Sequence, residues 1–244
     1  MAEAAKSWWA KAILIGSILG AVLLPVGALG TRFGIWGFQT GLLAVGAGTI
    51  LAVIGMFVGI IALFVSSKRG YTSDRPSILL GVMVSVLVLA TMGMQFYTAS
   101  SVPPIHDITT DVNDPPEFDV VVALRADAPN SLEYEPEAGE MQLTAYPSVK
   151  TLSLDVSRAE ALDRAINAME AMGMEVQNKD EVAGIVEGTA TTFWFGFKDD
   201  VVVRVRDSGS GSVVDVRSVS RVGVSDLGTN AKRIVELLSR LTAG

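Results

Sequence analysis

The first hundred residues contain three long apolar stretches separated by short polar segments. They cover residues 12–29, 36–66 and 77–97, and none contains a charged residue. Each reaches or exceeds the ~18–20 residues that a helix needs to cross the hydrocarbon core of a bilayer. Aromatic residues that favour the membrane interface lie near their ends: Trp8, Trp9, Trp36 and Tyr97. The pattern predicts a three-helix transmembrane anchor over residues 1–100.

The first stretch has a second interpretation, as a cleaved signal peptide, because lysines precede it and small residues lie near its end. Two further spans follow at once, which favours a membrane helix. Glycines recur four residues apart within the spans, a spacing that lets helix backbones approach each other. Packing inside the bundle and docking onto a partner membrane protein both fit these pairs: Gly16/Gly20, Gly37/Gly41 and Gly55/Gly59.

The basic residues predict the orientation of the anchor. If the helices alternate in direction, five basic residues lie on one side and Arg32 alone lies on the other: Lys6, Lys11, Lys68, Arg69 and Arg75. Basic residues collect on the cytoplasmic side. We therefore expect a multi-pass protein of the bacterial inner (cytoplasmic) membrane, with a cytoplasmic N-terminus and a periplasmic C-terminal domain. The spans lack the ionisable residues that mark a transport pathway, which argues against a pump or channel.

Residues 101–142 have the composition of a connector. They include six prolines and ten acidic residues, against Arg125 as the one basic residue. The segment is expected to be extended, with one short strand over residues 118–124. His106 lies in this segment, and a structural hydrogen-bonding role is favoured over catalysis.

Residues 143–244 show the alternation of a folded domain. Five short strands are predicted over residues 149–154, 173–177, 185–194, 201–206 and 213–219. A helix over residues 157–172 begins with the capping-box spacing of Ser157 and Glu160, and a last helix ends near Leu241. The order β-α-β-β-β-β-α indicates an α+β fold, with an antiparallel sheet carrying its helices on one face.

Composition narrows the classes of function. Residues 1–100 carry six basic and two acidic side chains, whereas the rest of the chain is strongly acidic, giving the whole a net charge of −7. The acidic character of residues 101–244 argues against a nucleic-acid partner, because binding a phosphate backbone needs a basic protein surface. The chain has no cysteine and one histidine, which excludes thiol chemistry and multi-histidine metal sites. No metal or cofactor is predicted.

The strand pair at 201–219 carries the leading candidate site. Its valines alternate with charged residues, so Arg204, Arg206, Asp215 and Arg217 share the sheet face opposite the valines. One interpretation is a ladder of cross-strand ion pairs. The other is an anion-binding cluster of guanidinium groups, with Arg221 as a fourth member.

Three neighbouring features also have two interpretations. The segment before the last helix is either a capped structural corner or an anion site at the helix N-terminus. Its residues are Gly223, Asp226, Gly228 and Asn230. Asp199 and Asp200 are expected to point to opposite sheet faces and therefore not to share a site. The aromatic residues at 193–197 fit either core and surface positions or an apolar edge that meets lipid or a partner.

Several separated motifs resemble those of domain-of-unknown-function family 1499. They are PPIHDITTD, DPPEF, QLTAYP, FGFKDDVVVRVR and VDVRSVSRVGVSDLGTNAKRI, and they cover residues ~103–241 in order. Members occur in bacteria and photosynthetic lineages, some with an added membrane region. The resemblance implies a fold and a lineage, but no activity and no catalytic residue.

Together these features favour a membrane-anchored, non-catalytic accessory, assembly or binding protein. The expected partners are the membrane itself, a larger membrane protein complex and an anionic lipid, with no nucleic acid. The alternative is an envelope enzyme or a lipid- or anion-handling domain that uses the arginine cluster.

Overall fold

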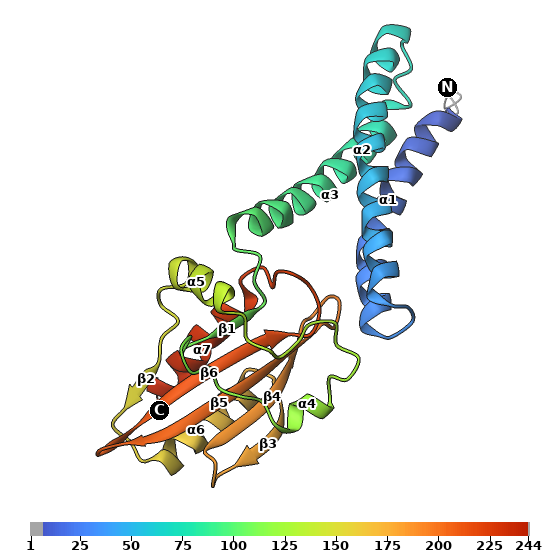
Figure 1. Cartoon of the computed structure of the whole chain (residues 1–244). Helices are drawn as coiled ribbons and strands as arrows, with labels where there is room; N and C mark the ends of the chain where they lie inside the picture. The colour runs from blue at the N-terminus through green and yellow to red at the C-terminus, as the bar shows by residue number, and fades with distance from the viewer. Residues whose placement is uncertain (1–6, 244) are drawn as a thin grey trace. The chain divides into compact units, whose positions relative to one another are not determined.

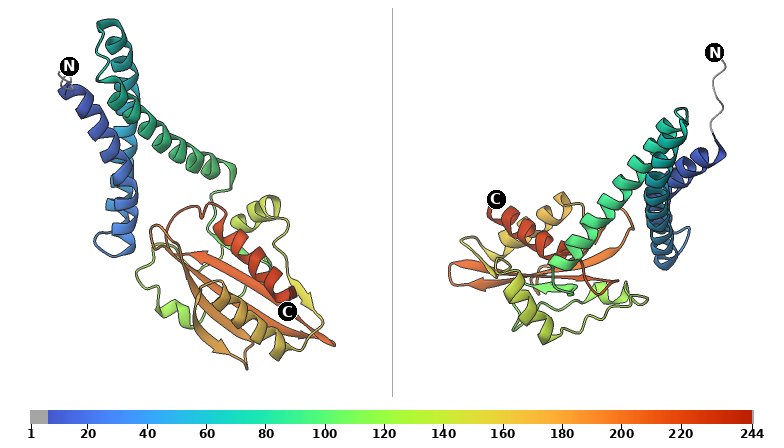
Figure 2. Two further views of the ribbon diagram at one scale, coloured as in Figure 1. Left: turned by 180° about the vertical axis from the view of Figure 1, so that it is seen from behind. Right: turned by 90° about the horizontal axis from the view of Figure 1, so that it is seen from above.

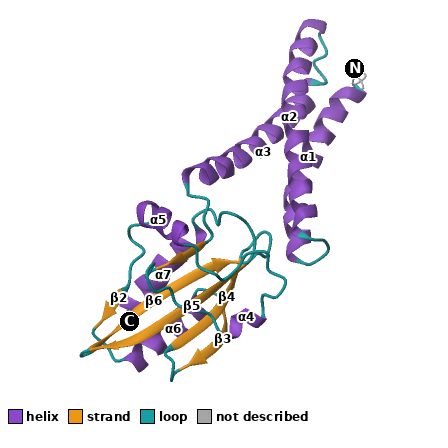
Figure 3. Cartoon of the chain, in the orientation of Figure 1, coloured by secondary structure: helices purple, strands orange, loops and turns teal. Residues whose placement is uncertain are grey.

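The computed structural model describes residues 7–243. The chain divides into two compact units. The first contains the chain up to Thr98 together with the loop Phe193–Gly196, and the second contains the other residues. Figures 1 and 3 show the helices and strands of both. Lys6, one of the basic residues used to predict the orientation, lies outside the described residues.

The first unit is built from three long helices. They are α1 (Trp8–Arg32), α2 (Phe38–Arg69) and α3 (Arg75–Ser101). All three are long and apolar enough to cross a membrane. The three predicted spans are therefore confirmed as helices, and the protein is a membrane protein by the length and composition of these segments.

Helices α1 and α2 approach each other through glycines. A Cβ atom placed on Gly48 would lie 2.6 Å from the carbonyl oxygen of Gly20, and one placed on Gly27 would lie 2.6 Å from that of Gly41. Such contacts admit no side chain, and of the predicted pairs Gly20 and Gly41 are the members that pack between α1 and α2 here. Gly16, by contrast, would have nothing within 4 Å of an added Cβ.

Polar contacts join α3 and the loop before it to the other helices. The hydroxyls of Ser17 in α1 and Ser85 in α3 are hydrogen-bonded at 3.0 Å. The carboxylate of Asp74 accepts hydrogen bonds from the backbone N–H and the hydroxyl of Ser7, at 2.8 and 2.7 Å. The start of α1 is thereby joined to the α2–α3 loop.

The second unit contains an antiparallel sheet in the order β1-β6-β5-β4-β3, with β2 also paired to β6. The strands are β1 (Asp107–Thr109), β2 (Leu152–Leu154), β3 (Glu175–Asp180), β4 (Ile185–Thr191), β5 (Lys198–Ser208) and β6 (Gly211–Ser220). The helices are α4 (Val120–Ala123), α5 (Pro136–Ala145), α6 (Arg158–Ala171) and α7 (Thr229–Ala243). The predicted α+β class and the order β-α-β-β-β-β-α from β2 to α7 are confirmed.

The core lies between one sheet face and the helices α6 and α7. The right-hand view of Figure 2 shows these two helices on one side of the sheet and α5 on the other. Val201, Val203 and Val205 of β5 are fully buried and belong to the same cluster as Ile234 and Leu237 of α7. The hydroxyl of Ser157 accepts a hydrogen bond from the N–H of Glu160 at 3.2 Å, which confirms the predicted N-cap of α6.

The segment at residues 101–142 differs from the sequence-based expectation in three ways, one of which is that the helix α5 begins in it at Pro136 and was not predicted. The segment also contributes β1, which pairs with β6 from Asp107 to Thr109 and was not predicted. The strand predicted over residues 118–124 is wrong, because residues 120–123 form the short helix α4. The backbone N–H groups of Asp119 and Val120 donate to the carboxylate of Glu187, at 2.7 and 2.9 Å, and so are not available to a sheet.

Candidate functional site

Four charged residues of the β5–β6 hairpin share one face of the sheet: Arg204, Arg206, Asp215 and Arg217. Arg204 lies directly opposite Asp215, and Val202 lies opposite Arg217. Directly opposed residues in an antiparallel pair point to the same side, so this face is the one away from the valine core. The predicted grouping of Arg204, Arg206 and Arg217 on one face is therefore what the register produces.

Asp215 is fully buried and is the centre of one set of contacts. Its Oδ2 atom lies 2.6 Å from Arg206 Nη2 and 3.3 Å from Arg204 Nη2. Its Oδ1 atom accepts hydrogen bonds from the hydroxyls of Thr110 and Thr151, at 3.1 and 2.6 Å. Both arginines also lie near carboxylates of the preceding segment, Asp111 and Asp114.

Arg217 is almost completely enclosed. Its Nε and Nη2 atoms bind the two carboxylate oxygens of Asp107, at 3.0 and 2.7 Å. The guanidinium group also donates to the carbonyl oxygens of Pro116 and Leu132. It lies 5.4 Å from the ring centroid of Tyr134, within the range of a cation–π contact.

The hydroxyl of Tyr134 has a raised pKa. Burial, and then the negative charge of Asp107, raise the pKa of Tyr134 to about 12, while Arg217 acts in the opposite direction. The hydroxyl is buried and has no hydrogen-bond partner within residues 7–243. This tyrosine therefore stays protonated at neutral pH.

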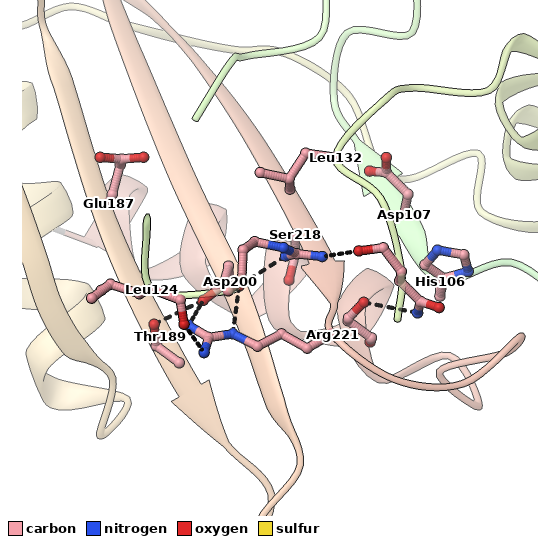
Figure 4. A network of polar contacts seen from close by, with 12 residues as sticks. His106, Asp107, Leu124, Leu132, Glu187, Thr189, Asp200, Ser218 and Arg221 are labelled. Atoms are coloured by element: carbon pink, nitrogen blue, oxygen red, sulfur yellow. Dashed lines mark hydrogen bonds and ion pairs between the residues drawn. The ribbon is translucent and has the colours of Figure 1, made fainter. Parts of the chain in front are cut away.

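The carboxylate of Asp200 contacts two further arginines, Arg125 and Arg221, and Figure 4 shows it beside Arg221. Its two oxygens lie 2.8 Å from Nε and Nη2 of Arg221, and its Oδ2 atom lies 2.8 Å from Arg125 Nη1. Thr189 donates its hydroxyl to the same carboxylate, and Arg221 also donates to the carbonyl oxygen of Leu124. Burial lowers the pKa of Arg125, and the charge of Asp200 partly opposes that effect.

Asp199, which directly precedes Asp200, faces the opposite side of the sheet. Asp199 lies 2.7 Å from Arg233 of α7. Because adjacent strand residues alternate between the two faces, Asp199 and Asp200 do not meet in one site, as predicted.

The corner before α7 is held by side-chain contacts. The carboxylate of Asp226 accepts hydrogen bonds from the backbone N–H groups of Gly228 and Asn230, at 2.8 and 2.7 Å. Gly223 and Gly228 have φ values of 102° and 76°, which favour glycine. Asn230 is fully buried and donates to the carbonyl oxygen of His106 and the hydroxyl of Ser220. Burial raises the pKa of Asp226, and the two backbone hydrogen bonds counteract this.

Residues 107–134 begin as the edge strand β1 and then run over the polar sheet face, and we call this segment the cover. It supplies Asp107 and Arg125 to the buried ion pairs, and it supplies carbonyl oxygens to Arg217 and Arg221. An external anion at Arg204, Arg206, Arg217 and Arg221 would have to compete with carboxylates already in contact. Anion binding by these four residues stays a prediction.

Sequence reasoning assigned no role to three buried members of this network: Asp107, Arg125 and Glu187. Arg125 carried a usable signal, because a single arginine in a strongly acidic segment beside the apolar run VVVAL suggests a buried ion pair. Asp107 and Glu187 carried none, since each is one of many acidic residues. No group of three histidine or acidic side chains suited to a metal ion occurs within the described part of the chain.

A family model described as Protein of unknown function (DUF1499) matches residues 107–241. This match covers more than half of the chain. The chain belongs to this family. No curated protein matches the sequence. The DUF1499 match begins at the first residue of β1, so the cover is part of the family domain, whereas the three membrane helices lie outside the matched residues.

Proposed function

We propose that this DUF1499 protein is a membrane-anchored, non-catalytic accessory, assembly or binding protein whose globular domain lies on the outer face of a bacterial inner membrane. The observation that carries the proposal is the pairing of the sheet-face charges with the cover. A catalytic or ligand-binding arginine cluster needs guanidinium groups that a substrate can reach. In this domain the guanidinium groups of Arg217 and Arg221 already donate hydrogen bonds to Asp107, to Asp200 and to backbone carbonyl oxygens.

Buried ion pairs of this kind are better suited to holding a segment in one conformation than to chemistry. They hold the cover on the sheet and leave its outer surface to meet other molecules. That arrangement supports a binding or scaffolding role for the domain at the membrane.

The periplasmic location of the domain rests on the charge distribution of the anchor. When the three helices alternate in direction, four basic residues fall on the side opposite Arg32: Lys11, Lys68, Arg69 and Arg75. The bias of basic residues toward the cytoplasm supports a location outside for the residues after α3.

Single-cysteine labelling tests this orientation, because the native chain has no cysteine. Ser210 lies in the exposed β5–β6 turn and Thr72 lies in the exposed α2–α3 loop. With a membrane-impermeant maleimide on intact spheroplasts, we expect Ser210→Cys to react and Thr72→Cys to react only after lysis. The reverse pattern would reject the periplasmic location.

The accessory role is tested by purification in a mild detergent followed by mass spectrometry of proteins. We expect a stoichiometric membrane protein partner that is retained at moderate salt. Recovery of the chain alone from cross-linked and from uncross-linked membranes would contradict the assembly role.

A further inference from the structure

A groove runs along α7 on the opposite side of the domain from the cover. It lies between α7 and the segment that leads from α5 to β2, and it encloses about 720 Å³. That volume is within the range of roughly 300–1,000 Å³ typical of small-molecule sites. Its walls are mainly apolar and include Val102, Tyr146, Val149, Ala231 and Val235.

One end of the groove contains an unpaired polar group. The hydroxyl of Tyr146 is buried and has no hydrogen-bond partner among the described residues. A Cβ atom on Gly228 would lie 3.4 Å from this hydroxyl and 3.6 Å from Val102 Cγ1, so the three residues meet at this end. A buried donor without a partner is costly, and a ligand oxygen that reached it would relieve that cost.

The edge of the groove formed by α7 carries basic side chains. Lys232 is exposed and forms no ion pair with any described residue. Arg240 lies two turns further along the helix, with its guanidinium group 2.7 Å from Glu236. The edge therefore has a net positive charge in a part of the chain that is otherwise strongly acidic, and it is complementary to an anionic group.

The groove is also connected to the membrane through the chain itself. Val102 directly follows α3, which ends at Ser101. With 27 residues, α3 is longer than the hydrocarbon core requires. At 1.5 Å per residue it spans about 40 Å against a core of about 30 Å. One wall residue thus follows directly in sequence on a helix that is long and apolar enough to cross the membrane.

We propose that this groove binds one acyl chain of an anionic membrane phospholipid, with the phosphate near Lys232 and Arg240. The apolar walls suit the acyl chain, and the basic edge suits the phosphate. The proposal goes beyond the accessory role and is independent of the orientation of the domain, because both leaflets present such lipids. Whether or not a protein partner is detected, the lipid proposal therefore stands or fails separately.

The test uses the full chain in lipid nanodiscs that contain phosphatidylglycerol with a photoreactive acyl chain in a phosphatidylcholine background. After irradiation, adducts are mapped by proteolysis and mass spectrometry. We expect adducts on the peptides that contain Tyr146 and Val235, in addition to those on α1–α3. Adducts confined to the membrane helices would overturn the proposal.

A matched pair of variants tests the groove itself. Val235 is 40% exposed and lines it, whereas Val182 is 91% exposed in the β3–β4 turn and does not. Val235→Asp should lower the adducts on the domain by about tenfold, because an unpaired carboxylate against an acyl chain is strongly unfavourable. Val182→Asp should leave them unchanged. The adducts on α1–α3 are the internal reference, and equal labelling of the two variants would reject the groove.

A second pair of variants tests recognition of the anionic head group. Lys232→Glu should lower labelling of the domain by photoreactive phosphatidylglycerol several-fold and leave labelling by photoreactive phosphatidylcholine unchanged. Lys198→Glu, at an exposed position at the start of β5 outside the groove, is the control. Equal labelling of the wild-type domain by the two lipids would reject the anionic specificity.

Discussion

Asp200 is a single carboxylate shared by two arginines that come from distant parts of the chain. Its side chain is fully buried, and the side chains of Arg125 and Arg221 are 4% and 13% exposed. Removing one member of a buried ion pair leaves the other as an uncompensated charge, which is more costly than the loss of the attraction itself. The stability of the cover on the sheet should therefore depend strongly on this residue.

We predict that Asp200→Asn lowers the free energy of unfolding of the domain by about 3–5 kcal/mol, the usual cost of breaking a buried pair. The measurement is pulse proteolysis of the full chain in detergent across a urea series. Asp127→Asn removes one negative charge from an exposed position in the cover and should change stability by less than about 0.5 kcal/mol. Equal stability of the two variants would show that the Asp200 network contributes little.

Tyr134 gives a prediction about high pH. Its folded pKa of about 12 is above the ordinary value of 10.0, so the folded state retains the phenolic proton longer than the unfolded state does. The stability that this proton contributes is complete below pH 10 and is lost as the pH rises toward 12. Because the hydroxyl has no partner in the described structure, Tyr134→Phe should not lower stability at pH 7.

The phenolate absorbance of the folded chain near 295 nm measures this titration. The component that titrates near pH 12 should be missing in Tyr134→Phe, and the decrease in stability between pH 10 and 12 should be smaller. A variant that titrates like the wild type would show that the late-titrating group is another tyrosine.

At the scale of elements, the pattern of valines and charges predicted the hairpin of β5 and β6 correctly. Alternation has a period of two, and it assigns the valines and the arginines to opposite faces without any knowledge of the partner strands. The same approach was wrong for α4. Residues 120–122 are three consecutive valines, which favours a strand, but the Glu187 carboxylate on β4 binds the N–H groups of Asp119 and Val120 and stabilises a helical turn.

The start of α7 provides a prediction for an element. Asp226→Ala should lower the free energy of unfolding by about 0.5–2 kcal/mol, because it removes the acceptor for the N–H groups of Gly228 and Asn230. Asp226→Asn keeps one of the two acceptor oxygens and should be less harmful than Asp226→Ala at pH 7. Denaturation of both variants, followed by pulse proteolysis, provides the comparison.

The pH dependence separates the wild type from Asp226→Asn. Burial raises the folded pKa of Asp226, so its contribution to stability is complete below the unfolded pKa near 3.8 and decreases as the pH rises through the folded pKa. The stability of the wild type relative to Asp226→Asn should therefore fall from acidic to neutral pH. A relative stability that rises over the same range would contradict the raised pKa.

At the scale of the whole molecule, the second unit has its own core, its own sheet and a family match that begins at Asp107. A domain with its own core should fold without the membrane helices. The cover should be essential to it, because it supplies Asp107 and Arg125 to ion pairs that are otherwise broken.

We predict that a fragment of residues 99–244 is soluble and unfolds cooperatively, whereas a fragment of residues 143–244 does not fold. The shorter fragment leaves the buried charges of Arg217 and Asp200 without Asp107 and Arg125. Circular dichroism during thermal unfolding distinguishes the two fragments. Equal cooperativity would show that residues 99–142, which include the cover, are not needed for folding.

The sequence by itself determined the three membrane helices, the α+β class, the order of elements from β2 to α7 and the face on which each hairpin residue lies. These properties follow from local periodicity and from runs of apolar residues, which are present in any short window of the chain. The tertiary structure alone decided which carboxylates Arg217 and Arg125 contact. Arg217 meets Asp107 from 110 residues away, and Arg125 meets Asp200 from 75 residues away. Such partners depend on strand order and on the path of the cover, and no local pattern contains that information.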